Sequence, residues 1–288
     1  YKRGLCIAIN NLGLVYMDQG EYDKALELFQ TDLKISQEIG HKRGIGIALN
    51  NMGDIYYYRG EYDKAIELYT MDLRISEEIG DRWGVGLTSG YLGNVYREIG
   101  KYGKAIEVIQ KFLKISEESG DKLRIGTACC FLGDVYLEMG ELDKAEDYLM
   151  KAERILKDIG NKDVLMALYL QYSSIQLIKG AAIEQALKFA EIASKLGHDL
   201  GSKSGQANCY LAFGKIYLVA GKFNEAEENL KNAIELFSAI GRKKLLADTY
   251  AEYAWMLKKS GRAKKLIDEY LEKAIDIYQA LKLEHKTM

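Results

Sequence analysis

Proline is absent from this chain of 288 residues, although glycine occurs 28 times. Proline normally stops helices and stiffens loops, so a chain without it lacks one of the two residues that commonly end a helix. Glycine can adopt the left-handed backbone conformation and is left to end the helices alone. The composition therefore favours a chain that is nearly all helix with very short turns.

Cysteine and histidine are scarce, with four and three residues respectively. Cys6, Cys129, Cys130 and Cys209 form no Cys-x-x-Cys pair, and the histidines stand apart from any second ligand at metal spacing. We interpret the cysteines as reduced, inert thiols of a cytoplasmic protein. We expect no metal and no cofactor.

Neither charge nor hydrophobicity points to a nucleic acid or a membrane. The net charge is −2, so the basic footprint of a nucleic-acid-binding protein is missing. No apolar run approaches the roughly 20 residues that cross a bilayer, and no signal-peptide pattern stands before the first repeat. We therefore expect a cytoplasmic protein whose partners are proteins.

What the sequence has in abundance is a repeat of about forty residues, marked by glycines at equivalent positions. One series is Gly20, Gly60, Gly100, Gly140, Gly180, Gly221 and Gly261, and the other is Gly40, Gly80, Gly120, Gly160, Gly201 and Gly241. Such self-similarity is typical of a solenoid, in which each unit buries its apolar face only against its neighbours. We predict one array over residues 1–288, with repeats at about 1–40, 41–80, 81–120, 121–160, 161–201, 202–241 and 242–282.

Residues 41–80 illustrate the predicted unit. A first helix over residues 41–59 has an apolar stripe at spacings of four, three and four residues, formed by Ile45, Leu49, Met52 and Tyr56. Gly60 ends this helix, and a second helix follows up to Gly80. Asp81 and Asp121, each directly after such a glycine, are expected to cap the next helix.

Small residues recur in the middle of the first helices, where glycine costs about 1 kcal/mol relative to alanine. They are Gly13, Gly53, Gly93, Gly133, Ser173, Gly214 and Ala254. We interpret them as points of close approach to the second helix, where they face Ala25, Ala65, Ala105, Ala145, Ala186 and Ala226.

These residues resemble the tetratricopeptide repeat (TPR) family. Its pattern stands as Leu12, Gly13, Tyr16, Ala25 and Phe29, and again as Met52, Gly53, Tyr56, Ala65 and Tyr69. The period of 40 rather than about 34, and Gly-Asp in place of the family's proline, resemble a long-repeat subclass that includes Pins-type adaptors and arrays of microbial regulators. The resemblance implies an all-α fold, a right-handed α-solenoid superhelix of seven helix-turn-helix repeats. The seventh repeat departs most, with Ile267 in place of the alanine.

In such a solenoid the first helices line a concave groove. Five asparagines are predicted to face it, and a carboxamide can pair with both polar groups of a ligand backbone. Helices roughly 10 Å apart and a ligand rising about 3.3 Å per residue give about three ligand residues per repeat. The Pins-type resemblance likewise implies a bound peptide. The candidate peptide-binding residues are Asn10, Asn11, Asn50, Asn51, Asp54, Tyr57, Tyr91, Asn94, Arg97, Phe131 and Asp134.

Two features of this groove have a second interpretation. Any single asparagine is explained as a solvated residue on an exposed helix, and only the set favours a ligand. Farther along, the predicted inner wall becomes apolar, with Leu177, Ile178, Leu218 and Val219. Those residues either receive a helix or a second copy of the chain, since exposed apolar patches mark interfaces, or are buried by tighter curvature.

No motif indicates an enzyme. The Gly44-x-Gly46 and Gly84-x-Gly86 pairs lack the strand and the Gly-Lys-Ser/Thr of a phosphate loop. We expect a non-enzymatic scaffold that binds a peptide or extended segment of a partner protein. Two alternatives stay open: a sensor or regulatory module of a larger signalling or transcription-regulating protein, because no polar capping helix precedes the first repeat, and self-association.

Overall fold

The computed structural model describes residues 2–180, 183–281 and 283, and this part of the chain contains fourteen α-helices and no strand. The helices are α1 (Lys2–Asp18), α2 (Tyr22–Glu38), α3 (Lys42–Tyr58), α4 (Tyr62–Glu78), α5 (Arg82–Glu98), α6 (Tyr102–Ser119), α7 (Lys122–Glu138), α8 (Leu142–Ile159), α9 (Lys162–Ile178), α10 (Ile183–Leu200), α11 (Lys203–Val219), α12 (Phe223–Ala239), α13 (Lys243–Lys259) and α14 (Lys264–Ala280). The predicted all-α fold of seven helix-turn-helix pairs is confirmed. Within these residues, no helix combines the length and the apolarity that a membrane span requires.

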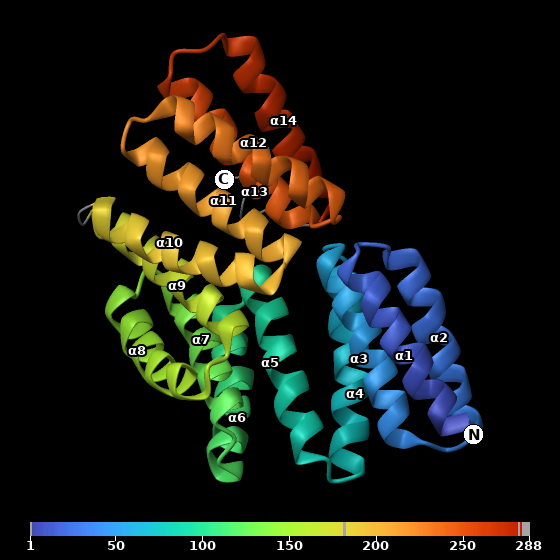
Figure 1. The fold of residues 1–288 in the computed structure, drawn as a ribbon. Coiled ribbons are helices and arrows are strands. Elements are labelled where there is room, and N and C mark those ends of the chain that lie inside the picture. The colour runs from blue at the N-terminus through green and yellow to red at the C-terminus, as the bar shows by residue number, and fades with distance from the viewer. Residues whose placement is uncertain (1, 181–182, 282, 284–288) are drawn as a thin grey trace. The chain divides into compact units, whose positions relative to one another are not determined.

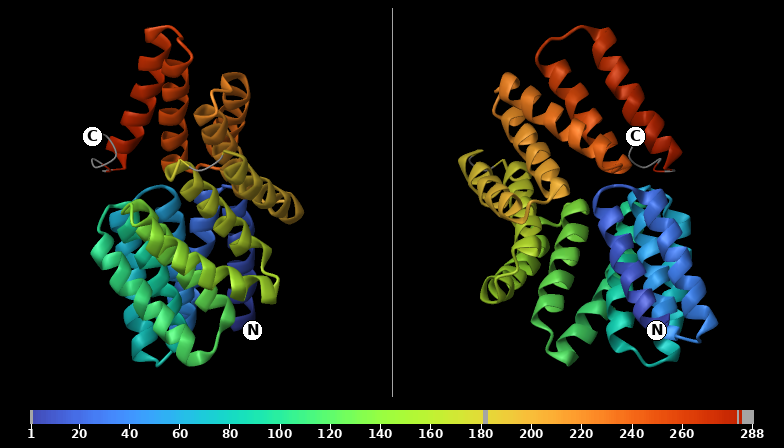
Figure 2. Two further views of the ribbon diagram at one scale, coloured as in Figure 1. Left: turned by 90° about the vertical axis from the view of Figure 1, so that its left-hand side faces the viewer. Right: turned by 45° about the vertical axis from the view of Figure 1, so that its right-hand side comes forward.

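The helices form two compact units, residues 1–119 with α1–α6 and residues 120–288 with α7–α14. Inside each unit, every helix packs on its hairpin partner, and each second helix also packs on the next first helix (Figures 1 and 2). Consecutive first helices touch as well, α1 with α3 and α3 with α5 in the first unit. We call the continuous face formed by α1, α3 and α5 the inner face of the first unit. One array through both units stays a prediction.

The helix ends follow from glycine, as predicted. Gly60 has a φ of 75°, and its N–H donates to Tyr57 O at 2.9 Å while that of Glu61 donates to Tyr56 O at 2.8 Å. These two bonds satisfy carbonyls that the helix itself leaves free. All glycines of both series have positive φ. The predicted caps are confirmed too: Asp81 accepts from Gly84 N and Asp121 from Arg124 N, each at 3.0 Å.

Close helix pairing explains the small residues, with one correction. A Cβ on Gly53 would lie 2.7 Å from Cε1 of Tyr69, so this glycine makes room for a large side chain of the second helix rather than facing Ala65. The same holds for Gly13 against Phe29. The facing alanines are fully buried, and two of the small residues do lie against theirs: a Cβ on Gly133 would be 3.7 Å from Ala145 O, and Ser173 donates to Ala186 O at 3.0 Å.

The predicted apolar stripe of α3 is partly buried: Leu49 and Met52 lie in the core, while Ile45 and Tyr56 are half-buried. Met52 is 8% exposed because it packs among α2 residues such as Phe29, whereas its equivalent Leu12 is 47% exposed. Leu5, the α1 equivalent of Ile45, is also exposed. The hairpin of α1 and α2 packs against α3, which accounts for the burial of Met52.

The four cysteines are free and buried. Burial raises the pKa of the Cys209 thiol to about 11 and that of Cys130 well above its usual value. Because the thiolate is the reactive form, these side chains are inert at neutral pH.

Candidate functional site

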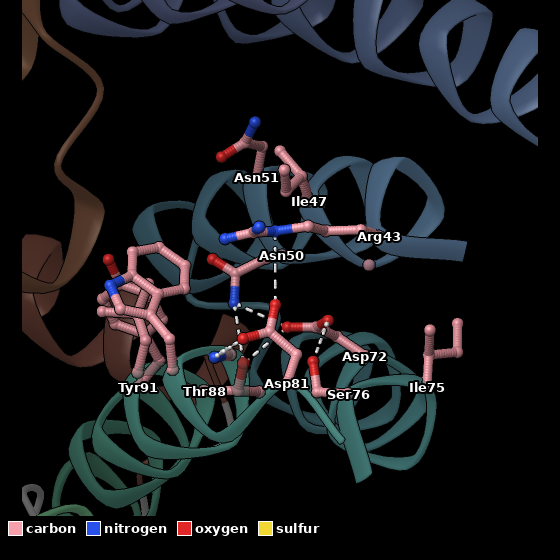
Figure 3. A pocket seen from close by; sticks show the side chains of 14 residues that line it. Arg43, Ile47, Asn50, Asn51, Asp72, Ile75, Ser76, Asp81, Thr88 and Tyr91 are labelled. Carbon is pink, nitrogen blue, oxygen red and sulfur yellow. Dashed lines mark hydrogen bonds and ion pairs between the residues drawn. The ribbon is translucent and has the colours of Figure 1, made fainter. Parts of the chain in front are cut away.

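A pocket of about 130 Å³ opens on the inner face of the first unit, between α3 and α5, with α4 behind it (Figure 3). Its floor is polar and buried, formed by Asn50, Asp72 and Thr88. Its mouth is apolar and partly exposed, with Ile47 at 38% and Trp83 at 41% exposure. Repeats two and three therefore build this hollow together.

The floor is a hydrogen-bonded cluster drawn from three helices. Asn50 Nδ2 on α3 donates to Asp72 Oδ2 on α4 at 3.1 Å and to Thr88 Oγ1 on α5 at 3.3 Å. The Thr88 hydroxyl donates to the same Asp72 oxygen, and Ser76 Oγ donates to Asp72 Oδ1 at 3.4 Å. Figure 3 shows Asn50 pointing from α3 towards Thr88 and Asp72. The cluster fixes how α4 and α5 pack on α3.

Asp72 is a buried carboxylate, 5% exposed, and all its neighbours in this cluster are neutral. Burial raises the pKa of Asp72, and the donors Thr88, Asn50 and Ser76 oppose that shift. Among the residues that the structure describes, no Lys, Arg or His forms an ion pair with it. Neutral donors alone therefore stabilise its charged form.

The mouth carries a stacked cation. The Arg43 guanidinium lies 5.9 Å from the centre of the Trp83 ring, and Arg43 Nε lies 3.3 Å from Asp81 Oδ2. Asp81 also caps α5 through Gly84 N. The aromatic ring is thus held by a partly exposed ion pair at the rim, where a ligand entering the pocket would contact it.

The predicted carboxamides do not all face outward. Asn50 is buried in the floor cluster, which corrects the expectation that it lies open in the groove, because Asp72 and Thr88 offer its amide two acceptors. Asn51 is half-buried, lines the pocket and donates through Nδ2 to Asn10 Oδ1 at 2.5 Å. Neighbouring first helices are therefore close enough for direct side-chain bonds. Asn11 is exposed and Asn94 is half-buried.

Tyr91 and Asp54 lie in one aromatic cluster. The Tyr69 hydroxyl donates to Asp54 Oδ1 at 2.5 Å, and the Tyr69 ring stacks on that of Tyr91 with centroids 5.7 Å apart. Burial first, and then the Asp54 carboxylate, raises the pKa of both tyrosines. Tyr91 lines the pocket, so the cluster holds one wall of it in place.

Tyr57 and Arg97 meet at a second point of the inner face. Glu98 is 5% exposed and accepts from Arg97 Nη2 at 2.6 Å and from the Tyr57 hydroxyl at 3.4 Å. The Tyr57 ring packs on Tyr58 and Tyr62. These polar groups bind one another across α3 and α5, so they shape the face more than they offer free donors.

Phe131 and Asp134 lie on α7 in the second unit, where both are half-buried. The register seen in the first unit recurs there, because Gln171 Nε2 donates to Cys130 O at 3.2 Å, across the same interval of 41 residues as Asn51 and Asn10. In the apolar stretch of the second unit, Ile178 and Val219 are exposed while Leu218 is buried. This apolar stretch is therefore only partly buried.

Sequence reasoning missed the pocket residues Asp72, Thr88, Arg43 and Trp83. A signal for Asp72 exists in the repeat itself. Its position in the second helix holds an acid in the first two repeats, but Phe112 and Ala152 in the next two. An acid where other repeats place apolar residues indicates a special environment.

Comparison with known proteins agrees with this geometry. One tetratricopeptide repeat family model matches residues 5–78 and 85–158, and a second matches residues 207–239. No curated protein sequence matches the chain.

Several solved structures are similar in fold. A Rap protein complexed with competence and sporulation factor is 14% identical, with a TM-score of 0.77 over 95% of this chain and 74% of that one. The Rap conjugation gene regulator of plasmid pLS20, in complex with a Phr peptide, is 15% identical, with a TM-score of 0.76 over 96% and 74%. A signal transduction ATPase with a tetratricopeptide repeat sensor from Pyrococcus horikoshii is 18% identical, with a TM-score of 0.60 over 95% and 41%.

At these identities, the structural likeness concerns the fold alone. The family models cover more than half of the sequence, and the described residues form the helix pairs of such repeats. The chain belongs to the tetratricopeptide repeat family.

Proposed function

We propose that this chain is a non-enzymatic scaffold that binds an extended segment of a partner protein on the inner face of the first unit. The pocket between α3 and α5 carries this proposal, because its apolar mouth is open to solvent while its polar floor is fully organised. Concave sites with apolar walls and a few placed polar groups are the usual form of ligand sites.

The inner face offers more than one contact point. Ile47 and Trp83 provide exposed apolar surface, Asn51 provides a carboxamide in the same pocket, and Asn11 is an exposed carboxamide on α1. Three first helices at a spacing of roughly 10 Å would meet about nine residues of a strand that rises about 3.3 Å per residue. A linear segment, rather than a small metabolite, matches this length.

The similar structures also support a peptide as the ligand. Two of them are complexes, one with competence and sporulation factor and one with a Phr peptide. Those ligands belong to those proteins. For this chain they support only the class of ligand, a short peptide segment.

The test is selection of a random twelve-residue peptide library on the immobilised chain, followed by measured affinities for the enriched peptides. The inner-face variant combines Ile47→Ser and Trp83→Ala. Both side chains are partly exposed, so the fold should tolerate their loss. An aromatic anchor contributes about 2 kcal/mol or more, so affinity should fall about 30-fold.

The matched control lies on α4 and at its end, where Met71→Ser and Ile79→Ser remove side chains of similar exposure, 44% and 38%. This control variant should keep the affinity of the parent chain. Equal loss in both variants, full retention in the inner-face variant, or failure of the library to yield any binding peptide would contradict the proposal.

A second candidate is a sensor or regulatory module within a larger protein. The similar ATPase carries its tetratricopeptide repeats as a sensor, and this chain covers only 41% of its length. Sequencing the transcript that encodes this chain, beyond both ends, tests this candidate. A reading frame without a further domain would contradict it.

Self-association is a third candidate, favoured by exposed apolar residues on α1 and α14. Val15 on α1 is 50% exposed, and Leu271 and Ile275 on α14 are 40% and 38% exposed. Large exposed apolar surface is a common mark of an interface. Light scattering over a range of concentrations should show a rising mass, and a constant monomer mass would exclude this candidate.

A further inference from the structure

Asp72 presents an unusual charge balance at the base of the pocket. It is a buried carboxylate that the described cations leave without an ion pair, and its partners Asn50, Thr88 and Ser76 are neutral. A buried charge is costly unless a partner of opposite sign compensates it. This buried carboxylate lies in the floor of an open pocket rather than in a sealed core.

Among the first three repeats, only the second places an acid of the second helix against a glycine of the first helix. The equivalent acid of the first repeat, Asp32, is covered by Cys6, whose thiol also lies 3.6 Å from Ser36 Oγ. In the second repeat the position of Cys6 is Gly46, and a Cβ there would collide with Asp72 Oδ1. In the third repeat Phe112 replaces the acid and lies against Gly86. Only the second repeat of these three combines an acid with a bare glycine.

The size and walls of the pocket restrict what can reach Asp72. A cavity of about 150 Å³ accommodates benzene, so this pocket of about 130 Å³ has room for a side chain of similar size. The way in passes Ile47, Leu87 and Trp83, which suit an aliphatic stem. The end point has the carboxylate of Asp72, which accepts from the Asn50 amide nitrogen and from the Thr88 and Ser76 hydroxyls. An aliphatic stem with a cationic head is the form of lysine and arginine.

We propose that the pocket binds a cationic side chain, lysine or arginine, of the captured segment, with its stem against Ile47 and Trp83 and its head at Asp72. This inference rests on the proposed function, since it takes the cation to be part of the bound segment. Arg43 at the mouth does not oppose it, because Asp81 neutralises that guanidinium at 3.3 Å. The pocket then has one uncompensated negative charge, that of Asp72.

The experiment uses small probes in place of the unidentified partner. n-Butylammonium and n-butylguanidinium chloride are titrated into the ¹⁵N-labelled full chain at constant ionic strength, with 1-butanol as the neutral probe of equal stem. The Trp83 indole N–H and the Asn50 side-chain amide report on the mouth and the floor. At least one cation should shift both signals with a Kd of about 1 mM, an affinity typical of so small a ligand, while 1-butanol binds at least 10-fold more weakly.

Two substitutions complete the test. Asp72→Asn keeps the shape of the side chain and should weaken cation binding at least 10-fold. Asp32→Asn, the matched acid that Cys6 covers, should leave binding unchanged. Equal binding of 1-butanol and the cations, no binding of either cation, or full binding by a folded Asp72→Asn variant would overturn the proposal. The comparison of probes uses the parent chain, so the test stands even where Asp72→Asn does not fold.

The outcomes separate this inference from the proposed function. Cation binding in the pocket, without any selected peptide, would contradict the scaffold proposal and still support the cation site. Selected peptides that lack lysine and arginine, together with no cation binding, would contradict the cation site and still support the scaffold proposal.

Discussion

Gly53→Ala tests whether helix pairing in the first unit depends on the missing side chain. The new Cβ would lie 2.7 Å from Cε1 of Tyr69, well inside the 3.5–4.0 Å at which carbon atoms attract. Tyr69 is poorly able to retreat, because its hydroxyl bonds to Asp54 and its ring stacks on Tyr91. The substitution therefore forces two helices apart or strains the wall of the pocket.

Two opposing free energies set the magnitude. Alanine in place of a mid-helix glycine gains about 1 kcal/mol of helix propensity. Overpacking a well-filled core costs about 1–3 kcal/mol. The expected net effect is a loss of about 1 kcal/mol in the free energy of unfolding. Gly103→Ala on α6 is the matched control, because nothing lies within 4 Å of its Cβ, and it should gain up to about 1 kcal/mol.

Urea unfolding followed by tryptophan fluorescence measures this difference. The chain has two tryptophans, Trp83 in the first unit and Trp255 in the second. In a Trp255→Phe background, the fluorescence of Trp83 reports the first unit alone. If Gly53→Ala proves as stabilising as Gly103→Ala, the close approach of α3 and α4 is refuted.

Three further predictions concern the pocket, the start of α9 and the core of the second unit. Burial raises the pKa of Asp72, so the carboxyl contributes most to stability below its usual pKa of about 3.9, and this contribution is lost as the pH rises through the pKa of the folded state. The free energy of unfolding of Asp72→Asn, relative to that of the parent chain, should therefore increase with pH above about 4. A difference in urea unfolding that does not change with pH would contradict this sign. Asn161→Ala removes the cap that accepts from Val164 N at 2.9 Å and should cost about 1 kcal/mol in thermal unfolding, whereas no measurable loss would mean that water caps α9 equally well. Phe237→Ala empties a fully buried site and should cost about 3–5 kcal/mol, read from Trp255 fluorescence in a Trp83→Phe background; a cost below 1 kcal/mol would show that the site collapses around the cavity.

The helix pairs and their ends could be predicted from the sequence because their causes are local. Glycine at Gly60 takes a φ of 75° because it has no Cβ, whatever surrounds it. The stripe that contains Leu49 and Met52 follows from the helical period alone. The error at Leu12 arose where burial depends on a neighbouring hairpin rather than on the period.

The pocket could not be predicted in the same way, because it needs three helices in contact. Asn50 and Asn51 are adjacent in the sequence, yet one lies in the floor cluster and the other bonds to Asn10 on the preceding first helix. Their separation follows from the helical rotation between consecutive residues, combined with the positions of α1, α4 and α5. Their distinct roles become visible only once those helices pack.

The sequence by itself determined the family, the seven helix pairs and the glycine-bound turns, since a repeated local pattern specifies a repeated local structure. Only the tertiary structure decided where the surface is hollow and charged. Asp72, Gly46 and Thr88 lie on three helices, and the carboxylate packs directly against Gly46, where the first repeat has the side chain of Cys6.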